Sequence, residues 1–507
     1  MAYAAAVLLG ACGGGGSGDA LPPPAAAFTD PVLYSTDAAA ALPSAAEITS
    51  VTHHLLVLGG ATLAYTATAG HMTARSLPGQ APEASFFYVA YTLDNREAAT
   101  RPVTFFYNGG PGSATVWLHL GSFGPKRLVT GDPSTSAPTP FPLIDNAESL
   151  LDVTDMVFVD AVGSGLSEAI APNTNQSFWG VDADATVFRD FVMRYVAVNN
   201  RTASPKFLFG ESYGTTRSAV LANLLESAGV QVDGVVLQSS VLNYNTNCAV
   251  VAPAVKLSCG SYVPSYGAIG AWFNLDSPNP DSANLVPFLA QMRTLTDAAY
   301  EPAVAVFLTM AMAPEAGLLL QLSGSTGLAF AKWQAGFNAP PDYYRANLIP
   351  GVLLGRYDAR VGAAFGSPLT SEGDPSSTFV APAFASAIAS YLSNDLKYTN
   401  PSIYVTLSSA ASTWVYAHDQ LALPDTIPDL ATAMAHNPRL KVLSLSGYHD
   451  LATPFFQTER DLSRLGPTPN VQLRSYLGGH MTYLDDGARV LEKADLAQFY
   501  QAATAAP

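Results

Sequence analysis

The stretch Gly210–Gly214 (GESYG), directly after the apolar run Phe207–Phe209, is the strongest local signal in this sequence. Its G-x-S-x-G pattern is typical of a sharp turn between a strand and a helix, on which a serine hydroxyl stands clear of the sheet. Glycines flank such a turn because the neighbouring backbone comes too close for side chains. Residues 215–225 continue with the apolar spacing of a helix. The pattern is short enough to occur by chance, so its interpretation depends on partner residues elsewhere.

Runs of apolar and β-branched residues predict the strands of one large sheet. Such runs lie at 47–68, with a hairpin turn at Gly59-Gly60, and at 85–93, 102–107, 156–160, 235–237, 441–445 and 471–476. Residues 182–198 show the apolar spacing of a helix. Strands that alternate with helices predict an α/β fold, with a mainly parallel central sheet flanked by helices on both faces.

Changes in composition divide the chain of 507 residues into segments. Residues 46–242 and 401–507 carry the strand and helix patterns, and we expect them to form two parts of one core domain. Residues 243–400 are rich in Ala, Leu, Pro and Met, which predicts a mostly helical cap insertion over the carboxyl edge of the sheet. Within it, the apolar run 303–322 is interrupted by a Pro-Glu pair, so two cap helices are a better interpretation than a membrane span.

The N-terminal residues resemble the signal of an exported bacterial lipoprotein. The apolar segment 1–11 is too short to span a bilayer and leads into Cys12, which would carry the lipid anchor. The Gly-, Ala- and Pro-rich segment 12–45 is then expected to be a flexible tether. Neither Lys nor Arg precedes the apolar run, which leaves an ordinary apolar N-terminus with an incidental cysteine as the alternative. The first interpretation predicts export to the periplasm or cell envelope, with membrane contact only through Cys12.

The other two cysteines are Cys248 and Cys259. An exported protein would permit a disulfide between them, and their spacing allows such a bond without requiring it. Zinc is the weaker interpretation, because neither cysteine has a second Cys or a His at the spacing of metal ligands.

The overall charge argues against a nucleic-acid partner. The net charge is -16, and no cluster of Lys or Arg could neutralise a run of phosphates. A hydrophobic content of 49% with 13% charged residues describes a well-packed globular protein.

A serine hydroxyl becomes a good nucleophile only when an adjacent imidazole accepts its proton and a carboxylate orients that imidazole. Asp450 and His480 each follow a predicted strand. The order Ser212, Asp450, His480 is the one found in α/β-hydrolases, in which both partners lie just beyond strand ends. His449 also stands at a strand end and is the alternative base.

Acyl transfer also needs N–H groups aimed at a developing oxyanion. One is expected from Tyr213, the residue after the nucleophile. The loop Asn108–Gly112 (NGGPG) follows an earlier strand, and its bare glycines let backbone N–H groups approach a substrate. A tight surface turn is the alternative interpretation of this loop, and a phosphate loop is excluded because the GKS/T ending is absent.

Together these motifs resemble the serine carboxypeptidase family, peptidase family S10, which has the α/β-hydrolase fold. The matching pieces, in chain order, are 108–113 (NGGPGS), 160–167 (DAVGSGLS), 210–214, the loop of Asp450 and 479–481 (GHM). The resemblance implies roles for seven residues: Ser212 as nucleophile, His480 as base, Asp450 as its orienter, the N–H groups of Gly110 and Tyr213 as oxyanion hole, and Asn108 and Glu211 as ligands of the C-terminal carboxylate of a peptide substrate. It implies no cofactor and no metal ion.

Two carboxylates form a hydrogen bond only when one of them holds a proton. If Glu211 binds a terminal carboxylate, it must be protonated, which predicts the best peptidase activity below neutral pH. The alternative is that Glu211 is a solvated residue at the rim of the site.

The chain departs from the family pattern at several positions. The Trp that usually precedes the Asn-Gly-Gly loop is replaced by Phe106-Tyr107, and the Cys-Ser-Ser that follows the loop by 113–115 (SAT). Many members pair the Glu beside the nucleophile with a second acid shortly before a Gly-Pro, where this chain has Ser122. The loop of Asp450 keeps one of the family's two acids. These changes leave acyl transfer intact and weaken the case for terminal-carboxylate recognition.

The sequence therefore predicts a serine carboxypeptidase that acts through an acyl-enzyme on peptides with a free C-terminus. An esterase, amidase or acyltransferase on the same fold is the first alternative. A non-catalytic surface binding protein is the second, and the intact set Ser212, Asp450 and His480 argues against it.

Overall fold

The computed structural model describes residues 28–131, 141–250, 255–277, 279–280 and 284–505. The signal segment 1–11, Cys12 and the tether as far as residue 27 lie outside the described residues. The strands of the central sheet are β2 (Thr49–Leu58), β3 (Ala61–Arg75), β4 (Pro82–Leu93), β5 (Val103–Tyr107), β8 (Asp155–Val159), β9 (Glu168–Ala169), β10 (Lys206–Glu211), β11 (Gly234–Gln238), β15 (Lys441–Gly447) and β16 (Val471–Tyr476).

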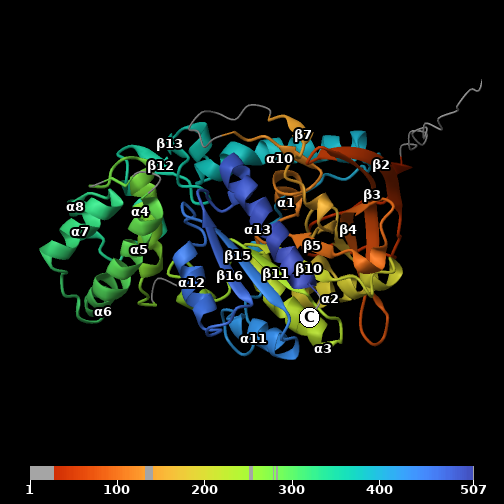
Figure 1. Cartoon of the computed structure of the whole chain (residues 1–507). Coiled ribbons are helices and arrows are strands. Elements are labelled where there is room, and N and C mark those ends of the chain that lie inside the picture. The colour runs from red at the N-terminus through yellow and green to blue at the C-terminus, as the bar shows by residue number, and fades with distance from the viewer. Residues whose placement is uncertain (1–27, 132–140, 251–254, 278, 281–283, 506–507) are drawn as a thin grey trace, which may run out of the picture.

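The sheet has the order β16-β15-β11-β10-β5-β8-β4-β3-β2, with β9 paired to β4 (Figure 1). The strands from β16 to β8 run parallel, and β4, β3 and β2 continue the sheet antiparallel. Every residue of β5, β8, β10 and β11 is buried, as expected of strands covered on both faces. The prediction of a mainly parallel α/β sheet is confirmed.

Helices cover both faces of the sheet. One face is packed by α1 (Val116–Gly121), α10 (Pro375–Asn394) and α13 (Asp486–Thr504), and the other by α2 (Val181–Val198), α3 (Tyr213–Ser227) and α11 (Ile427–His436). The alternation of side chains along a strand supplies both interfaces, since Phe209 of β10 packs on the first face and Leu208 on the second. The core is thus a three-layer α/β structure.

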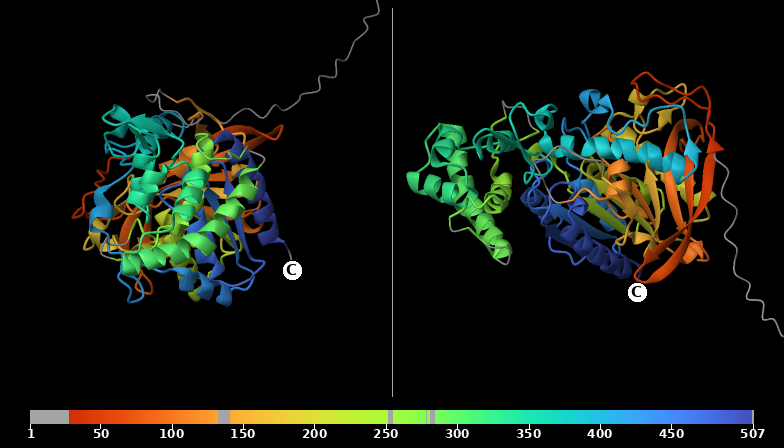
Figure 2. Two further views of the ribbon diagram at one scale, coloured as in Figure 1. Left: turned by 90° about the vertical axis from the view of Figure 1, so that its left-hand side faces the viewer. Right: turned by 90° about the horizontal axis from the view of Figure 1, so that it is seen from above.

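A helical lobe projects from one end of this core, as Figures 1 and 2 show. Its helices are α4 (Val263–Trp272), α5 (Leu285–Leu295), α6 (Glu301–Met310), α7 (Ala316–Thr326), α8 (Phe330–Ala335) and α9 (Pro341–Asn347), with a π-helical turn η6 (Thr296–Tyr300) between α5 and α6. Their buried side chains form a separate hydrophobic cluster, which also takes in Phe455 and Phe456 of α12 (Phe455–Ser463). The predicted break in the run 303–322 falls between α6 and α7.

Short elements complete the description. The 3-10 helices are η1 (Ala98–Thr100), η2 (Leu150–Asp152), η3 (Asn175–Phe178), η4 (Tyr244–Thr246), η5 (Gly260–Tyr262), η7 (Pro368–Thr370), η8 (Ser409–Thr413) and η9 (Thr482–Leu484). The two-stranded pairs are β1 (Phe28–Thr29) with β14 (Tyr398–Thr399), β6 (Lys126–Leu128) with β7 (Leu143–Asp145), and β12 (Val352–Leu354) with β13 (Gly362–Ala364). Among the helices of the described ranges, none has the length and apolar character needed to cross a membrane.

Two predicted boundaries differ from the structure. The prediction that the tether 12–45 is flexible is wrong for 28–45: β1 pairs with β14, and buried Asp30 accepts a hydrogen bond of 2.6 Å from Tyr398. The segment 243–400 is not a single cap either, because α10 packs against the sheet and not in the lobe. Both errors come from contacts between residues far apart in sequence, which composition does not reveal.

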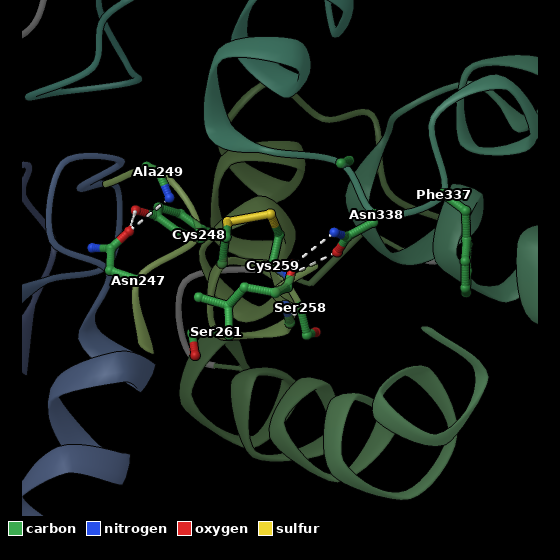
Figure 3. Close-up of a disulfide and its surroundings, with 12 residues drawn as sticks. Asn247, Cys248, Ala249, Ser258, Cys259, Ser261, Phe337 and Asn338 are labelled. Carbon is green, nitrogen blue, oxygen red and sulfur yellow. Dashed lines mark hydrogen bonds between the residues drawn. A yellow bond between two sulfur atoms is a disulfide. The ribbon is translucent and has the colours of Figure 1, made fainter. Parts of the chain in front are cut away.

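The structure joins Cys248 and Cys259 in a disulfide, with the two Cα atoms 5.3 Å apart (Figure 3). Cys259 is buried in the hydrophobic cluster of the lobe, and its N–H donates to the Asn338 side chain at 2.8 Å. The bond therefore ties the chain that leaves the core to the first helix of the lobe.

Candidate active site

Ser212 stands on a strained turn between β10 and α3. Its backbone has φ 59° and ψ −127°, a conformation that costs a non-glycine residue about 1 to 3 kcal/mol. A Cβ on Gly210 would overlap the carbonyl of Gly214 and lie 2.5 Å from the hydroxyl of Ser218. The glycine is therefore required where strand and helix cross, and the turn lifts the serine out of the sheet.

Asp450 and His480 lie beyond the carboxyl ends of β15 and β16. The Nδ1 atom of His480 is 2.7 Å from Oδ2 of Asp450. The same carboxylate accepts N–H bonds from Ala452 (2.7 Å) and Thr453 (3.0 Å), and a bond of 2.7 Å from the Thr453 hydroxyl. These donors hold the carboxylate in one orientation, which fixes the imidazole and leaves its Nε2 atom for the serine.

His480 is buried, and its main chain is fixed on both sides. Its N–H donates to the carbonyl of Tyr357 at 2.6 Å, and its carbonyl accepts from the hydroxyl of Ser239 at 2.5 Å. Burial disfavours the charged imidazole, but the Asp450 carboxylate outweighs burial and raises the pKa of His480. A base with a raised pKa is suited to take the proton of a serine hydroxyl.

One pocket brings the predicted residues together. Its volume is about 530 Å³, including the mouth. Polar lining comes from Asn108, Gly110, Glu211, Ser212 and His480, and apolar lining from Trp117, Leu407 and Met481. Ser212 and His480 therefore face the same space, with Asp450 buried behind His480.

The structure does not bring His449 to this pocket. Its ring packs edge-on against Trp272 of the lobe, and its Nδ1 atom is buried without a hydrogen-bond partner among the described residues. Burial and the nearby Arg360 guanidinium lower the pKa of His449 to about 3. A neutral histidine at this place belongs to the packing between core and lobe, so His480 is the base that the geometry supports.

The loop after β5 presents backbone N–H groups beside the elbow. Gly110 has φ +100°, a left-handed conformation that favours glycine. Gly109 packs so closely that an added Cβ would overlap the N–H of Tyr213 and lie 2.6 Å from the nitrogen of Gly214. Tyr213 is the first residue of α3, so its N–H has no acceptor within the helix. This arrangement can serve as an oxyanion hole.

Asn108 and Glu211 form a buried pair in the pocket. The Asn108 amide Nδ2 donates to Oε1 of Glu211 at 2.9 Å, and its Oδ1 accepts from the N–H of Leu118 at 3.1 Å. Burial raises the pKa of Glu211 to about 7, against the opposing influence of the His480 charge and of its hydrogen-bond donors. The alternative of a solvated residue at the rim does not hold, since Glu211 is buried.

Sequence reasoning missed two groups that support this pair. Tyr483 of η9 donates its hydroxyl to Oε2 of Glu211 at 2.5 Å. Arg217 of α3 donates to the carbonyl of Asn108 at 2.9 Å and pairs with Asp184 at 2.7 Å. Ser122 does not take part, because its hydroxyl donates to the carbonyl of Leu118. No pattern marks Tyr483, and Arg217 is recognisable only as the one basic residue of α3.

Comparison with known proteins agrees with this geometry. The family model described as serine carboxypeptidase matches residues 60–253. Over this range the chain is similar to the serine carboxypeptidases. The matched range includes the elbow and the Asn108 loop, whereas Asp450 and His480 lie beyond it. No curated protein matches the chain significantly.

Solved structures share the fold of this chain. Kex1Δp, a prohormone-processing carboxypeptidase from Saccharomyces cerevisiae, is 14% identical with a TM-score of 0.53, over 86% of this chain and 91% of that one. A proline iminopeptidase from Mycobacterium smegmatis is 15% identical with a TM-score of 0.37, over 86% of this chain and 98% of that one. The first similarity supports the fold, and the second is too low to add to it. The chain is thus a serine hydrolase with the α/β-hydrolase fold.

Proposed function

We propose that this serine hydrolase is a carboxypeptidase, which removes the C-terminal residue of a peptide through an acyl-enzyme. The observation that carries the proposal is the buried pair of Asn108 and Glu211 beside Ser212. A protonated Glu211 can donate a hydrogen bond to a terminal carboxylate, and the Asn108 amide beside it is a second donor that lines the pocket.

The chemistry follows from the geometry. The hydroxyl of Ser212 attacks the last peptide carbonyl while Nε2 of His480 takes its proton, and Asp450 stabilises the imidazolium. The N–H groups of Gly110 and Tyr213 bind the oxyanion. His480 then passes the proton to the leaving amine, so the C–N bond breaks and the terminal amino acid departs. A water molecule, deprotonated by His480, hydrolyses the acyl-serine.

The test compares three blocked substrates with the same side chains: a dipeptide with a free C-terminus, its C-terminal amide, and an ester that lacks the carboxylate. We expect efficient cleavage of the free acid at pH 6 and cleavage of the amide slower by at least tenfold. Ser212→Ala should abolish all three activities and labelling by a fluorophosphonate. Equal rates for acid and amide, or turnover of the ester alone, would identify a generic esterase or amidase. A folded wild-type protein that takes no label would be a binding protein.

We also propose that the protein is exported and held at the membrane by a lipid on Cys12. The Cys248–Cys259 disulfide supports export, because such bonds persist in oxidising compartments. Incorporation of labelled fatty acid by the full-length chain, and its loss in Cys12→Ala, is the expected result. Equal incorporation in both proteins, or none in either, would contradict the anchor.

A further inference from the structure

The two oxygens of Glu211 are held by donors from different parts of the fold. Asn108 reaches Oε1 from the loop after β5, and Tyr483 reaches Oε2 from the loop after β16. We propose that Tyr483 is a positioning residue, whose hydroxyl fixes the side chain of Glu211 and stabilises its charged form. The inference rests on the proposed function, because Glu211 matters to the reaction only as the ligand of the terminal carboxylate.

The Tyr483 hydroxyl acts as a donor towards ionised Glu211. Tyr483 is fully buried, and burial together with the Glu211 carboxylate raises its pKa well above the ordinary range. The phenol therefore keeps its proton at any pH at which the enzyme works. An uncharged donor at 2.5 Å favours the carboxylate form of its acceptor without placing a second charge in the pocket.

The loop that carries Tyr483 is held rigidly, so the contact does not depend on a flexible side chain. Gln238, at the end of β11, donates to the hydroxyl of Thr482 at 2.9 Å and to the carbonyl of His480 at 3.3 Å. Arg489 of α13 donates to the carbonyl of Tyr483 at 3.1 Å. The base His480 and the positioning residue Tyr483 are thus parts of one braced loop.

Other titratable groups face Glu211, and their influence has a known direction. Positive charge on His480 lowers the pKa of Glu211, and the Asp450 carboxylate raises it. Tyr357 from the lobe side and Glu492 of α13 also interact with Glu211, and burial raises the pKa of Glu492 to about 8. A variant that removes only the Tyr483 hydroxyl leaves all four of these residues in place.

Tyr483→Phe removes that hydroxyl and keeps the ring. Without the donor, ionised Glu211 is less stable, so its pKa must rise. If protonated Glu211 binds the substrate, cleavage of a free-acid dipeptide then persists to higher pH. A hydrogen bond to a charged group corresponds to a shift of about one to two pH units in the alkaline limb of kcat/KM. The ester without a carboxylate should keep its profile, because its cleavage depends on His480.

Tyr500→Phe is the matched control. Tyr500 is also a buried tyrosine, and its hydroxyl is 2.8 Å from that of Thr104 at the opposite end of the sheet. The Tyr500→Phe substitution should leave the pH profiles for the free-acid dipeptide and for the ester unchanged. If Tyr483→Phe does not fold, Tyr483→Gln retains a donor and should shift the alkaline limb by less than one unit. An unshifted limb in folded Tyr483→Phe, an equal shift with the ester, or the same shift in Tyr500→Phe would overturn the proposal.

A second readout separates this proposal from the proposed function. Carboxyl ¹³C NMR follows the titration of Glu211 directly, with Glu211→Gln to assign its signal. We expect the Glu211 titration in Tyr483→Phe at higher pH than in the wild type, whether or not the enzyme prefers free carboxylates. Equal rates for the free acid and the amide, together with a shifted titration of Glu211, would reject the carboxypeptidase activity. They would still support the effect of Tyr483 on the charge of Glu211. A preference for the free acid with an unshifted titration would reject the role of Tyr483 alone.

Discussion

Replacing Glu211 by glutamine tests whether a proton on this residue is what the reaction needs. Glutamine has the same shape and always carries an N–H donor. Asn108 is fixed by its bond from Leu118, so its Nδ2 must face the amide oxygen of the new side chain. The new amide nitrogen then faces Tyr483, whose hydroxyl can turn to accept. The variant therefore fits the site as a permanent imitation of protonated Glu211.

The size of the effect follows from the pKa of Glu211, which burial raises to about 7. The protonated fraction of the wild type falls from about one half at pH 7 to about one hundredth at pH 9. The variant loses no donor over this range. The ratio of kcat/KM between variant and wild type, for a dipeptide with a free C-terminus, should therefore rise by about fiftyfold between pH 7 and pH 9.

The assay measures kcat/KM from pH 5 to pH 9 for both enzymes, with the free-acid dipeptide and with the ester. The acid limb, set by His480, should lie at lower pH in the variant, because the Glu211 charge that helps to raise the pKa of His480 is absent, and the same displacement should appear with the ester. A constant ratio between the enzymes across the whole range with the free acid would refute the reasoning. It would mean that Glu211 is not titrating in the productive complex or does not contact the substrate.

Three further variants test the framework of the site and the attachment of the lobe. Gly109→Ala places a Cβ against the elbow backbone and should lower kcat/KM by about a hundredfold, and unchanged turnover would contradict this close approach. Asp184→Ala leaves the buried Arg217 guanidinium unpaired and should cost about 3 to 5 kcal/mol in urea unfolding; a cost below 1 kcal/mol would be inconsistent with the pair's burial. Replacing both Cys248 and Cys259 by serine should cost about 3 kcal/mol through the loop that their bond closes, and lobe unfolding indistinguishable from that of the wild type would be evidence against the constraint.

The fold was predictable where local pattern and physical requirement agree. Parallel strands such as β5 and β10 are apolar runs because both faces are covered, and their ends place Asn108 and Ser212 at one edge of the sheet. Because β15 and β16 run parallel to β10, Asp450 and His480 reach the same edge of the sheet as Ser212. No comparable rule distinguishes α10 from the lobe helices in the sequence. All of these segments have similar composition and differ only in what they pack against.

The sequence predicted Asn108 and Glu211 as site residues but not the contacts by which the fold holds the Glu211 side chain. A serine, an imidazole and a carboxylate are recognised by their order, since each must follow a strand. The environment of Glu211 is built instead from Asn108 and Tyr483, which are 375 positions apart in the chain and are brought together only by the fold. The absence of an acid at Ser122 suggested a weaker carboxylate site, but a phenol from another loop occupies the second oxygen of Glu211. The second oxygen of Glu211 is thus held by a residue type that no sequence pattern marks, and only the folded geometry identifies it.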